Sequence, residues 1–386
     1  MTIGDLQKEF EKIYHKQAAH IFFCPGRVNL IGEHIDYNGG QVMPCAISLG
    51  TTLLVAKNED RQFRFRALDF PETAAIAFSQ DGYSKQGPEW FNYPLGVIHE
   101  FQKKGKEVSG LDLLFSGNLP IGSGLSSSAS IEVLTAFALN ELFEGGLTKV
   151  DLAILGKSVE NDFMGLNSGI MDQFAVAMGK EAHAVLLNTG TLEYEYLPFE
   201  IGDYVLAIVN SNKPRKLVES KYNERFGECR EALKRFQEKF PVQHLVEISV
   251  DDFEQNKVLL NDPVLEKRAR HVIAENDRVK KAKEALTSGD IDTFGALMYA
   301  SHNSLQELYE VSGIELDTIV DFCRTYKDCI GARMTGAGFG GCAIALIKQD
   351  SFDDFAEKVT AAYEEKIGYK PGVFSSVIAE GVHALV

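Results

Sequence analysis

The groups best suited to chemistry lie in a stretch rich in glycine and serine, LPIGSGLSSSAS at residues 119–130. Gly122 and Gly124 let the backbone approach a ligand closely, and the serines place hydroxyl groups beside the first amides of the helix expected after them. Amides at a helix start, together with the positive end of the helix dipole, attract anions without a lysine. We therefore predict that this stretch binds phosphate, with a serine-capped turn as the alternative.

A second group of polar residues follows Pro25 and Gly26. Within twelve residues it combines a guanidinium, carboxylates, an imidazole and amides, at Arg27, Asn29, Glu33, His34, Asp36, Tyr37 and Asn38. Such a set of donors and acceptors could bind several hydroxyl groups of one ligand. A polar hairpin loop without a ligand is the alternative.

Two more carboxylates have sequence contexts that suggest a function. Asp172 stands among apolar residues in GLNSGIMDQF, a segment expected to form a turn, and a carboxylate in such a setting needs either a partner or a role. Glu160 precedes it by twelve residues, in a helix expected over residues 149–163. One of the two could hold a metal ion while the other meets a substrate, although helix capping or a salt bridge would explain either.

Two other stretches allow more than one interpretation. Trp90, the only tryptophan, lies three residues before Tyr93, and a purine could stack on these rings, but an aromatic pair in the core gives the same pattern.

GARMTGAGFGG at residues 331–341 contains GxGxxG at Gly336, Gly338 and Gly341. A dinucleotide-binding turn needs a strand before it and a helix after it, whereas here we expect a helix before and a strand after. A dehydrogenase is therefore the least favoured interpretation.

The composition limits the partners of this chain. With 39 basic and 55 acidic residues the formal net charge is -16, which disfavours nucleic acid and anionic membranes, so an anionic ligand must be held by local groups. Six cysteines without a CxxC pair argue against a zinc site and a disulfide scaffold and favour a reducing, cytoplasmic compartment. No apolar run reaches the roughly 18 residues of a membrane span. The N-terminal segment predicts an amphipathic docking helix rather than a signal peptide.

The elements that must position these residues are both helices and strands. A length of 386 residues, 45% of them hydrophobic, is sufficient for two domains. Apolar runs predict strands at residues 21–24, 51–55, 63–66, 111–115 and 204–209. Periodic apolar positions predict helices at 131–143 and 149–163, and two long helices between 263 and 308 that are broken at Ser288 and Gly289. The phosphate-binding stretch is thus expected between a strand and a helix.

Three of these stretches together resemble the galactokinases of the GHMP kinase family, at residues 25–40 (PGRVNLIGEHIDYNGG), 119–130 and 331–341. The second and third mark the family broadly, whereas the first is close to diagnostic for galactokinases. GIMDQF, SHNSLQELYEVS and the pair Trp90 and Tyr93 are also similar, so the resemblance covers nearly the whole chain. It departs at Ser168, where a cysteine is common, and at residues 187–191, which read LNTGT where many relatives have an aspartate, a cysteine and an arginine.

The resemblance implies an α+β, two-domain GHMP kinase fold. The N-terminal domain, residues 1–197, would be similar to domain 2 of ribosomal protein S5, and the C-terminal domain, residues 198–386, would be a ferredoxin-like layered α/β domain. The implied reaction is the phosphorylation of the C1 hydroxyl of α-D-galactose by ATP with Mg²⁺, the first committed step of the Leloir pathway. The expected partners are galactose and ATP, without nucleic acid or membrane, and the expected state is a monomer.

The resemblance also implies roles for individual residues. Asp172 would be the base near the C1 hydroxyl, Arg27 would neutralise developing charge beside it, and Glu160 with Ser127 would hold magnesium. The residues implied to bind galactose are Glu33, His34, Asp36 and Tyr222. Those implied to bind the nucleotide are Trp90 and Tyr93 at the adenine and Gly122, Ser123, Gly124, Leu125, Ser126, Ser127 and Ser128 at the triphosphate.

Two rival functions fit parts of the same sequence. A kinase of this family for another sugar or alcohol would keep the stretches at 119–130 and 331–341 but leave GEHIDYN unexplained. A non-catalytic sensor of galactose and ATP would keep all three stretches. The uninterrupted serine stretch and the presence of Asp172 favour the enzyme.

Overall fold

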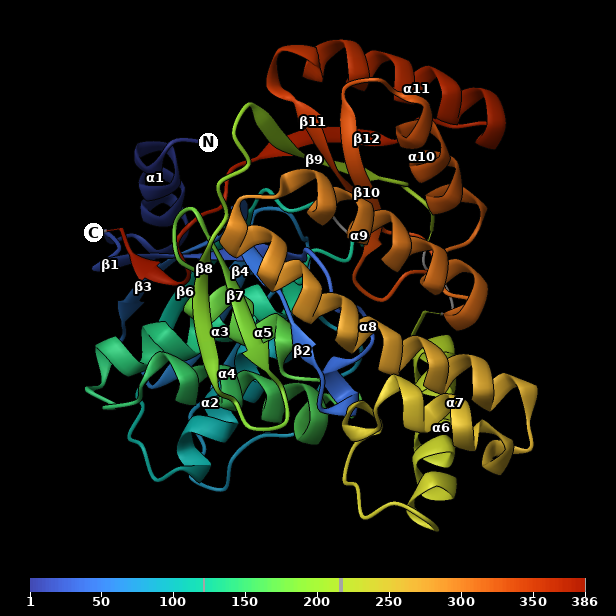
Figure 1. Cartoon of the computed structure of the whole chain (residues 1–386). Coiled ribbons are helices and arrows are strands. Elements are labelled where there is room, and N and C mark those ends of the chain that lie inside the picture. The colour runs from blue at the N-terminus through green and yellow to red at the C-terminus, as the bar shows by residue number, and fades with distance from the viewer. Residues whose placement is uncertain (121, 215–217, 386) are drawn as a thin grey trace.

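The computed structural model describes residues 1–120, 122–214 and 218–385 (Figure 1). Its largest sheet consists of β1 (His20–Asn29), β3 (Pro44–Lys57), β4 (Gln62–Ala67), β5 (Ala74–Ala77), β6 (Leu111–Gly117) and β13 (His383–Ala384). The strand order is β13-β1-β3-β6-β4-β5, and all neighbours are antiparallel except β4 and β6, which are parallel. The strands predicted at 51–55, 63–66 and 111–115 are confirmed as parts of β3, β4 and β6.

Strand β1 is longer than the sequence predicts and carries Arg27, the first of the predicted site residues. The prediction ends the strand at Cys24, before Pro25 and Gly26, but the strand continues to Asn29. A register shift between Pro25 and Arg27 in the pairing with β3 accommodates the proline, which has no N–H to donate. Arg27 therefore lies on a strand of the main sheet, where the pairing fixes its backbone.

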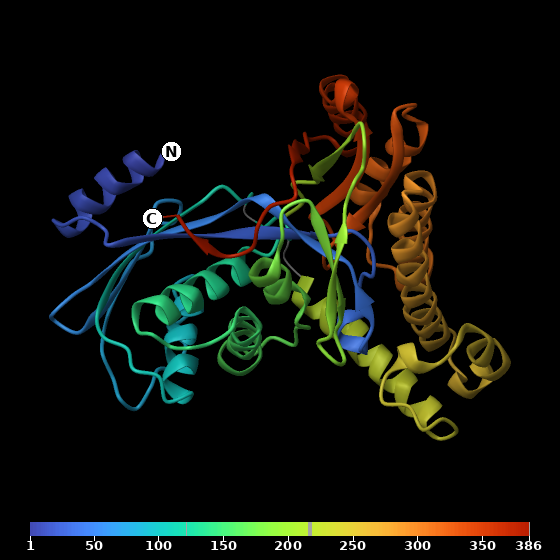
Figure 2. The same cartoon turned by 60° about the vertical axis from the view of Figure 1, so that its left-hand side comes forward.

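Helices cover both faces of this sheet (Figure 2). On one face lies α1 (Ile3–Tyr14), and its residues Leu6 and Phe10 are buried against Leu54, as the amphipathic pattern predicts. On the other face lie α2 (Asn92–Lys103), α3 (Ser127–Leu142), α4 (Lys149–Ser158) and α5 (Met171–Met178). A π-helical turn, Val159–Met164, extends α4. The helices predicted at 131–143 and 149–163 are thereby confirmed.

A second, four-stranded antiparallel sheet stands beside the first (Figure 1). It consists of β9 (Tyr204–Asn210), β10 (Cys329–Thr335), β11 (Cys342–Lys348) and β12 (Gly372–Ser376), in the order β10-β11-β9-β12. The helices that pack against it are α9 (Ile291–Ser304), α10 (Ile314–Thr325) and α11 (Phe352–Ile367). Gly295 lets α9 approach β10 closely, because a Cβ there would lie 2.3 Å from the carbonyl oxygen of Ile330.

A small sheet and a group of helices complete the fold. The small sheet contains β2 (Gln41–Val42), β7 (His183–Asn188) and β8 (Tyr194–Pro198), in the order β2-β7-β8. The other α-helices of this group are α6 (Val218–Gln237), the short α7 (Val250–Asn256) and α8 (Pro263–Ser288). Helix α8 contacts β2 and β8 as well as α6 and α9, and α8 and α9 confirm the two long helices predicted between 263 and 308. None of the described helices is both long enough and apolar enough to cross a membrane.

Two segments near the functional residues differ from their predictions. The segment GLNSGIMDQF is not a turn throughout, because α5 begins at Met171 and Asp172 lies in its first turn. The stretch at 331–341 begins inside a strand, β10, which the apolar pattern does not reveal because Gly331 and Arg333 interrupt it. This stretch joins β10 to β11 as an antiparallel hairpin, so GxGxxG here does not form a dinucleotide-binding turn.

The path of the chain between the sheets can be compared with the predicted domain boundary. The predicted boundary between residues 197 and 198 falls at the last two residues of β8. The last strand, β13, returns from the second sheet to the first and pairs with β1 at Phe22 and Phe23. The chain therefore passes from the first sheet through the small sheet to β9 of the second, and it returns to the first sheet after β12.

Candidate active site

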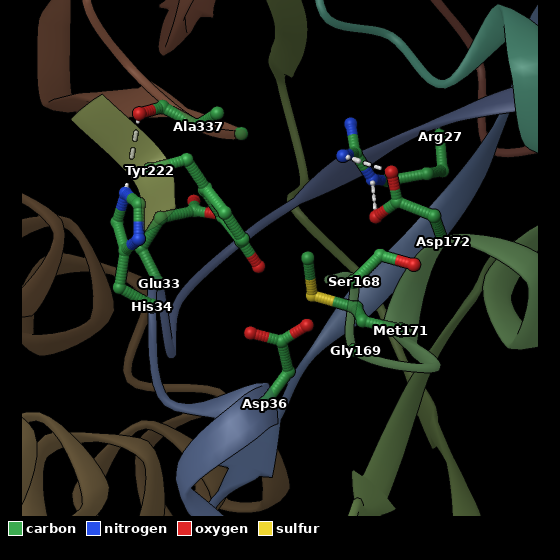
Figure 3. A pocket seen from close by; sticks show the side chains of 11 residues that line it. Arg27, Glu33, His34, Asp36, Ser168, Gly169, Met171, Asp172, Tyr222 and Ala337 are labelled. Carbon is green, nitrogen blue, oxygen red and sulfur yellow. Dashed lines mark hydrogen bonds and ion pairs between the residues drawn. The ribbon is translucent and has the colours of Figure 1, made fainter. Parts of the chain in front are cut away.

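A pocket of about 140 Å³ lies between the segment that follows β1, the start of α5, helix α6 and the turn between β10 and β11 (Figure 3). The residues that line it are Arg27, Glu33, His34, Asp36, Ser168, Gly169, Met171, Asp172, Tyr222, Gly336 and Ala337. The fold thus brings together six of the residues singled out from the sequence, namely Arg27, Glu33, His34, Asp36, Asp172 and Tyr222. In Figure 3, Arg27 and Asp172 lie on one side of the pocket and Glu33, His34 and Tyr222 on the other.

Arg27 and Asp172 form a two-point ion pair. The Nε atom of Arg27 donates to Asp172 Oδ1 at 2.9 Å, and its Nη2 donates to Oδ2 at 2.7 Å. The third nitrogen, Nη1, donates to the carbonyl oxygen of Gly124 at 2.8 Å. Burial by itself would lower the pKa of Arg27, but the charges of Asp172 and Glu33 raise it above its ordinary value. Arg27 is therefore a fixed positive charge that orients Asp172 and also touches the serine-rich loop.

Ser126 connects that loop to the same carboxylate. It has a left-handed backbone, with φ of 63°, and precedes the first residue of α3. Its hydroxyl does not cap the helix and instead donates to Asp172 Oδ2 at 2.5 Å. The first amides of α3 have no acceptor within their own helix and are not capped by Ser126, so they can bind an anion beside Asp172.

Two glycines of the loop have backbone conformations that glycine adopts more readily than other residues. Gly122 has φ of +69° and Gly124 has φ of +77°, both in the left-handed region that side chains disfavour. A Cβ at Gly26 would lie 2.5 Å from the Leu119 side chain and 2.7 Å from the carbonyl oxygen of Leu125. Gly26 therefore allows the loop to pack directly on β1, next to Arg27.

Glu160 is a buried carboxylate beside the start of α3. It accepts a hydrogen bond from Ser128 Oγ at 3.0 Å, and burial raises its pKa. The adjacent Ser127, which the resemblance pairs with Glu160, is exposed at the first position of the helix. Oxygen atoms are the ligands that Mg²⁺ prefers, and a cation would stabilise the charged form of this buried carboxylate, so these residues fit a magnesium ion by their chemistry.

Glu33 is held by an arginine that the sequence analysis missed. Arg333 of β10 is fully buried, and its Nη2 donates to Glu33 Oε2 at 2.9 Å while its Nη1 donates to the carbonyl oxygen of Asn29 at 2.9 Å. Burial raises the pKa of Glu33, although Arg333 and Arg27 act in the opposite direction. The sequence did contain a signal for Arg333, because it is a lone arginine between the apolar residues Ala332 and Met334. The stretch at 331–341 was interpreted only for its glycines.

His34 has protein partners at both ring nitrogens. Its Nε2 lies 3.2 Å from the carbonyl oxygen of Ala337, and its Nδ1 lies 2.9 Å from the hydroxyl of Tyr37, which in turn meets the hydroxyl of Tyr309 at 2.8 Å. Burial lowers the pKa of His34 to about 3, so the ring is neutral at pH 7. Because a carbonyl only accepts, Nε2 carries the proton and Nδ1 accepts from Tyr37. His34 thus ties the β10–β11 turn to the pocket wall.

Asp36 faces two other carboxylates across the pocket. Burial and the charges of Asp172 and Glu33 raise its pKa to about 7. Gly169, which the sequence analysis did not single out, makes room for it, because a Cβ at Gly169 would lie 1.9 Å from Asp36 Oδ2. The ring of Tyr222, from α6, packs against both His34 and Tyr37 at the same wall, with centroid distances of 5.7 Å and 5.3 Å.

The pair expected at the adenine lies outside this pocket. Trp90 packs against the rings of Phe70 and Phe115, and its Nε1 donates to the carbonyl oxygen of Glu72 at 3.0 Å. Phe115 belongs to β6, the strand that leads into the serine-rich loop, so Trp90 lies near the strand end of that loop. The backbone N–H of Tyr93 donates to the carbonyl oxygen of Trp90 at 3.2 Å, which places Tyr93 at the start of α2.

Comparison with known families and proteins gives matches along the whole chain. The galactokinase galactose-binding signature matches residues 8–57, the N-terminal domain of GHMP kinases matches residues 92–180, and the C-terminal domain of GHMP kinases matches residues 282–365. A galactokinase from Clostridium tetani is 50% identical over 386 residues, with 100% of this chain and 98% of the relative covered. A galactokinase from Lacticaseibacillus paracasei is 49% identical over 388 residues, with both chains fully covered.

Solved structures agree with these matches. The crystal structure of Lactococcus lactis galactokinase complexed with galactose superposes with a TM-score of 0.96 at 43% identity, covering 99% of this chain and 100% of the other. The mevalonate kinase of Methanococcus jannaschii has a TM-score of 0.65 at 21% identity, covering 94% and 99% of the two chains, and shares the fold.

Proposed function

The chain belongs to the galactokinases of the GHMP kinase family, and we propose that it transfers the terminal phosphoryl group of ATP to the C1 hydroxyl of galactose. The observation that carries this proposal is that the Asp172 carboxylate contacts both the pocket and the phosphate-binding loop. Asp172 lines the sugar-sized pocket and also bonds Ser126 of the phosphate-binding loop. A hydroxyl group bound in the pocket and a phosphate bound at the start of α3 would therefore meet beside Asp172.

Asp172 is proposed to accept the proton of the C1 hydroxyl as the new bond to phosphorus forms. Its two-point contact with Arg27 holds the carboxylate in one orientation, and the positive charge offsets the negative charge that develops on the transferred group. Phosphoryl transfer depends mainly on positioning and charge stabilisation, so this fixed geometry is the main contribution of the protein.

The pocket wall is proposed to orient the sugar. Glu33, Asp36 and Tyr222 offer carboxylate and hydroxyl groups for the sugar hydroxyls. His34 is proposed to stabilise the wall, since both of its ring nitrogens are already bonded within the protein. Sugars differ in the directions of their hydroxyl groups. Each wall residue must therefore keep one protonation state, so that it donates or accepts at a fixed place.

The nucleotide and its metal ion are proposed to bind on the loop side of Asp172. The residues expected around the triphosphate run from Gly122 to Ser128, and Trp90 and Tyr93 are expected to border the adenine. Glu160 would hold Mg²⁺ with Ser127, and Ser128 already contacts the Glu160 carboxylate. A magnesium ion held there would offset charge on the phosphate oxygens, for which the loop supplies no lysine.

We further propose a cytoplasmic monomer. None of the six cysteines forms a disulfide, and five of them are buried, as expected for a protein that folds in a reducing compartment. Light scattering of the purified protein at several concentrations tests the monomer, and a mass that doubles on concentration would contradict it.

The function is tested by incubating the purified chain with magnesium ATP and a panel of monosaccharides. We expect ADP release with galactose and a new phosphate at C1, identified by phosphorus NMR. The Asp172→Ala variant should give both more slowly by roughly 10²-fold or more. Turnover of another sugar or of a non-sugar alcohol, with none for galactose, would refute the substrate, and galactose binding without any ADP release would favour the sensor.

A further inference from the structure

Helix α8 holds the backbone of the pocket wall through two buried side chains that the sequence analysis gave no role. Glu275 and His271 lie one turn apart on α8, and both are fully buried. Glu275 Oε1 accepts hydrogen bonds from the backbone N–H of Gly32 at 3.0 Å and of Glu33 at 3.3 Å. His271 Nε2 lies 3.1 Å from the carbonyl oxygen of Glu33. Together the two side chains bind both polar groups of the Glu33 backbone.

His271 has one protonation state and one tautomer in this arrangement. The carbonyl oxygen of Glu33 can only accept, so the proton of the ring is on Nε2. The other nitrogen, Nδ1, then accepts from the hydroxyl of Ser304 on α9 at 2.8 Å. Burial lowers the pKa of His271 to about 4, in agreement with a neutral ring at pH 7.

The Glu275 carboxylate accepts its hydrogen bonds from buried groups of the protein. Burial alone would raise its pKa, but the charges of Arg278 and Arg333 and the hydrogen bond from Ser301 help lower it to about 2. Ser301 of α9 donates to Oε1 at 2.6 Å, and Arg278 donates to Oε2 at 2.6 Å. Loss of this carboxylate would leave the N–H groups of Gly32 and Glu33 buried without a charged acceptor.

The backbone of the wall is shaped to reach α8. Gly32 has φ of +96°, and a Cβ there would lie 2.7 Å from the carbonyl oxygen of Gln41 and 3.0 Å from the side chain of Val279 on α8. A glycine at this position is therefore required for the segment to approach the helix. Figure 1 shows α8 crossing the front of the molecule with α9 beside it. The clamp, by which we mean His271 and Glu275 with their hydrogen bonds to the backbone of Gly32 and Glu33, is thus built on two packed helices.

We propose that His271 and Glu275 are positioning residues for sugar binding, which act by fixing the backbone of Glu33 and through it the Glu33 carboxylate. Arg333 holds the side chain of Glu33 from β10 at 2.9 Å, so three buried groups from two elements hold this one residue. Neither His271 nor Glu275 lines the pocket, and their effect is therefore indirect. This inference rests on the proposed binding of galactose at Glu33.

The test compares Glu275→Gln with a matched variant of the same helix. Asn276 is also buried, and its Oδ1 accepts from the backbone N–H of Gln41 on β2 at 2.9 Å, outside the pocket. We expect Glu275→Gln to weaken galactose binding roughly tenfold, the scale of one hydrogen bond to a charged group. The KM for galactose should rise likewise, with the KM for ATP unchanged. Asn276→Ala should lower Tm and leave the galactose Kd, measured by titration calorimetry, as in the wild type.

A purely structural role predicts a different result. If Glu275→Gln and Asn276→Ala weaken galactose binding to the same extent at equal loss of Tm, the proposal is wrong. Should Glu275→Gln fail to fold, Ser304→Ala tests the same clamp, because it removes only the partner of His271 Nδ1. A galactose Kd unchanged in Ser304→Ala, with the protein folded, would also overturn the proposal.

A double-mutant cycle shows whether the clamp acts through Glu33. In a Glu33→Ala background, Glu275→Gln should weaken galactose binding by less than about twofold further, because the residue it positions has gone. Full additivity of the two substitutions would contradict the proposal. A wild-type protein that neither binds nor phosphorylates galactose would instead refute the proposed function, so the two failures are distinguishable.

Discussion

Replacing Asp36 by asparagine should make the ligand-free protein more stable and less able to bind galactose. The pKa of Asp36 is raised from 3.8 to about 7 by burial and by the charges of Asp172 and Glu33. Below pH 3.8 the group is protonated in both the folded and the unfolded chain and has no net effect on stability. As the pH rises, the unfolded chain ionises freely while the folded protein resists ionisation, so stability falls until the pH passes about 7.

The size of the effect follows from the shift. Three pKa units correspond to about 4 kcal/mol at most. Because Asp36 is only partly buried, solvent should reduce this to roughly 2 kcal/mol. Asparagine has nearly the same shape and keeps one acceptor oxygen but cannot ionise. We therefore expect Asp36→Asn to exceed the wild type in free energy of unfolding by roughly 2 kcal/mol at pH 8, with the difference vanishing toward pH 4.

The measurement is urea denaturation of both proteins without ligands between pH 4 and pH 8.5. Asp321→Asn, an exposed site on α10, is the control, and its difference from the wild type should not grow with pH. In parallel, the galactose KM of the wild type should fall as the pH rises through 7, because sugar hydroxyls donate to the ionised carboxylate. Asp36→Asn should lack this dependence. Equal or lower stability of Asp36→Asn at pH 8 would refute the electrostatic reasoning.

Three further predictions follow from the site. Asp172→Ala and Arg27→Ala should each lower kcat by roughly 10² or more, the scale of losing a general base or a contact to developing charge, measured by coupled ADP release; near-normal turnover in either would reject its role. Gly169→Ala should raise the galactose KM roughly tenfold with little change in Tm, because the new Cβ displaces the Asp36 carboxylate; an unchanged KM would show that Asp36 does not contact the sugar. Glu160→Gln should raise the magnesium concentration needed for half-maximal activity while galactose binding by calorimetry without metal stays as in the wild type, and an unchanged magnesium requirement would remove Glu160 from the metal site.

The local sequence was sufficient for the long helices, for the central strands of the two larger sheets, and for the kinds of groups in the pocket. Apolar periodicity predicts α3, α8 and α9 because each must bury one face against a sheet or a neighbouring helix. Glu33, His34 and Asp36 stand out because polar groups crowd a segment with buried residues on both sides. The prediction failed where a special residue hides an element, as in β1, where Pro25 conceals a continuous strand, and in β10, where Arg333 interrupts the apolar run.

Partners far apart in the sequence were beyond any local pattern. Arg27 and Asp172 are 145 residues apart, and Glu33 and Arg333 are 300 residues apart. Gly169 gave no signal either, because its function is to leave space for the Asp36 carboxylate.

The sequence by itself determined which chemical groups are present, which of them lie in short polar segments, and that a loop of glycines and serines precedes a helix, because these depend on residues close along the chain. The tertiary structure alone decided that Ser126 turns its hydroxyl to Asp172, that His34 uses both nitrogens within the protein, and that α8 holds the backbone of Glu33. Hydrogen bonds and ion pairs depend on distances of about 3 Å, and only the packing of whole sheets and helices brings such groups that close.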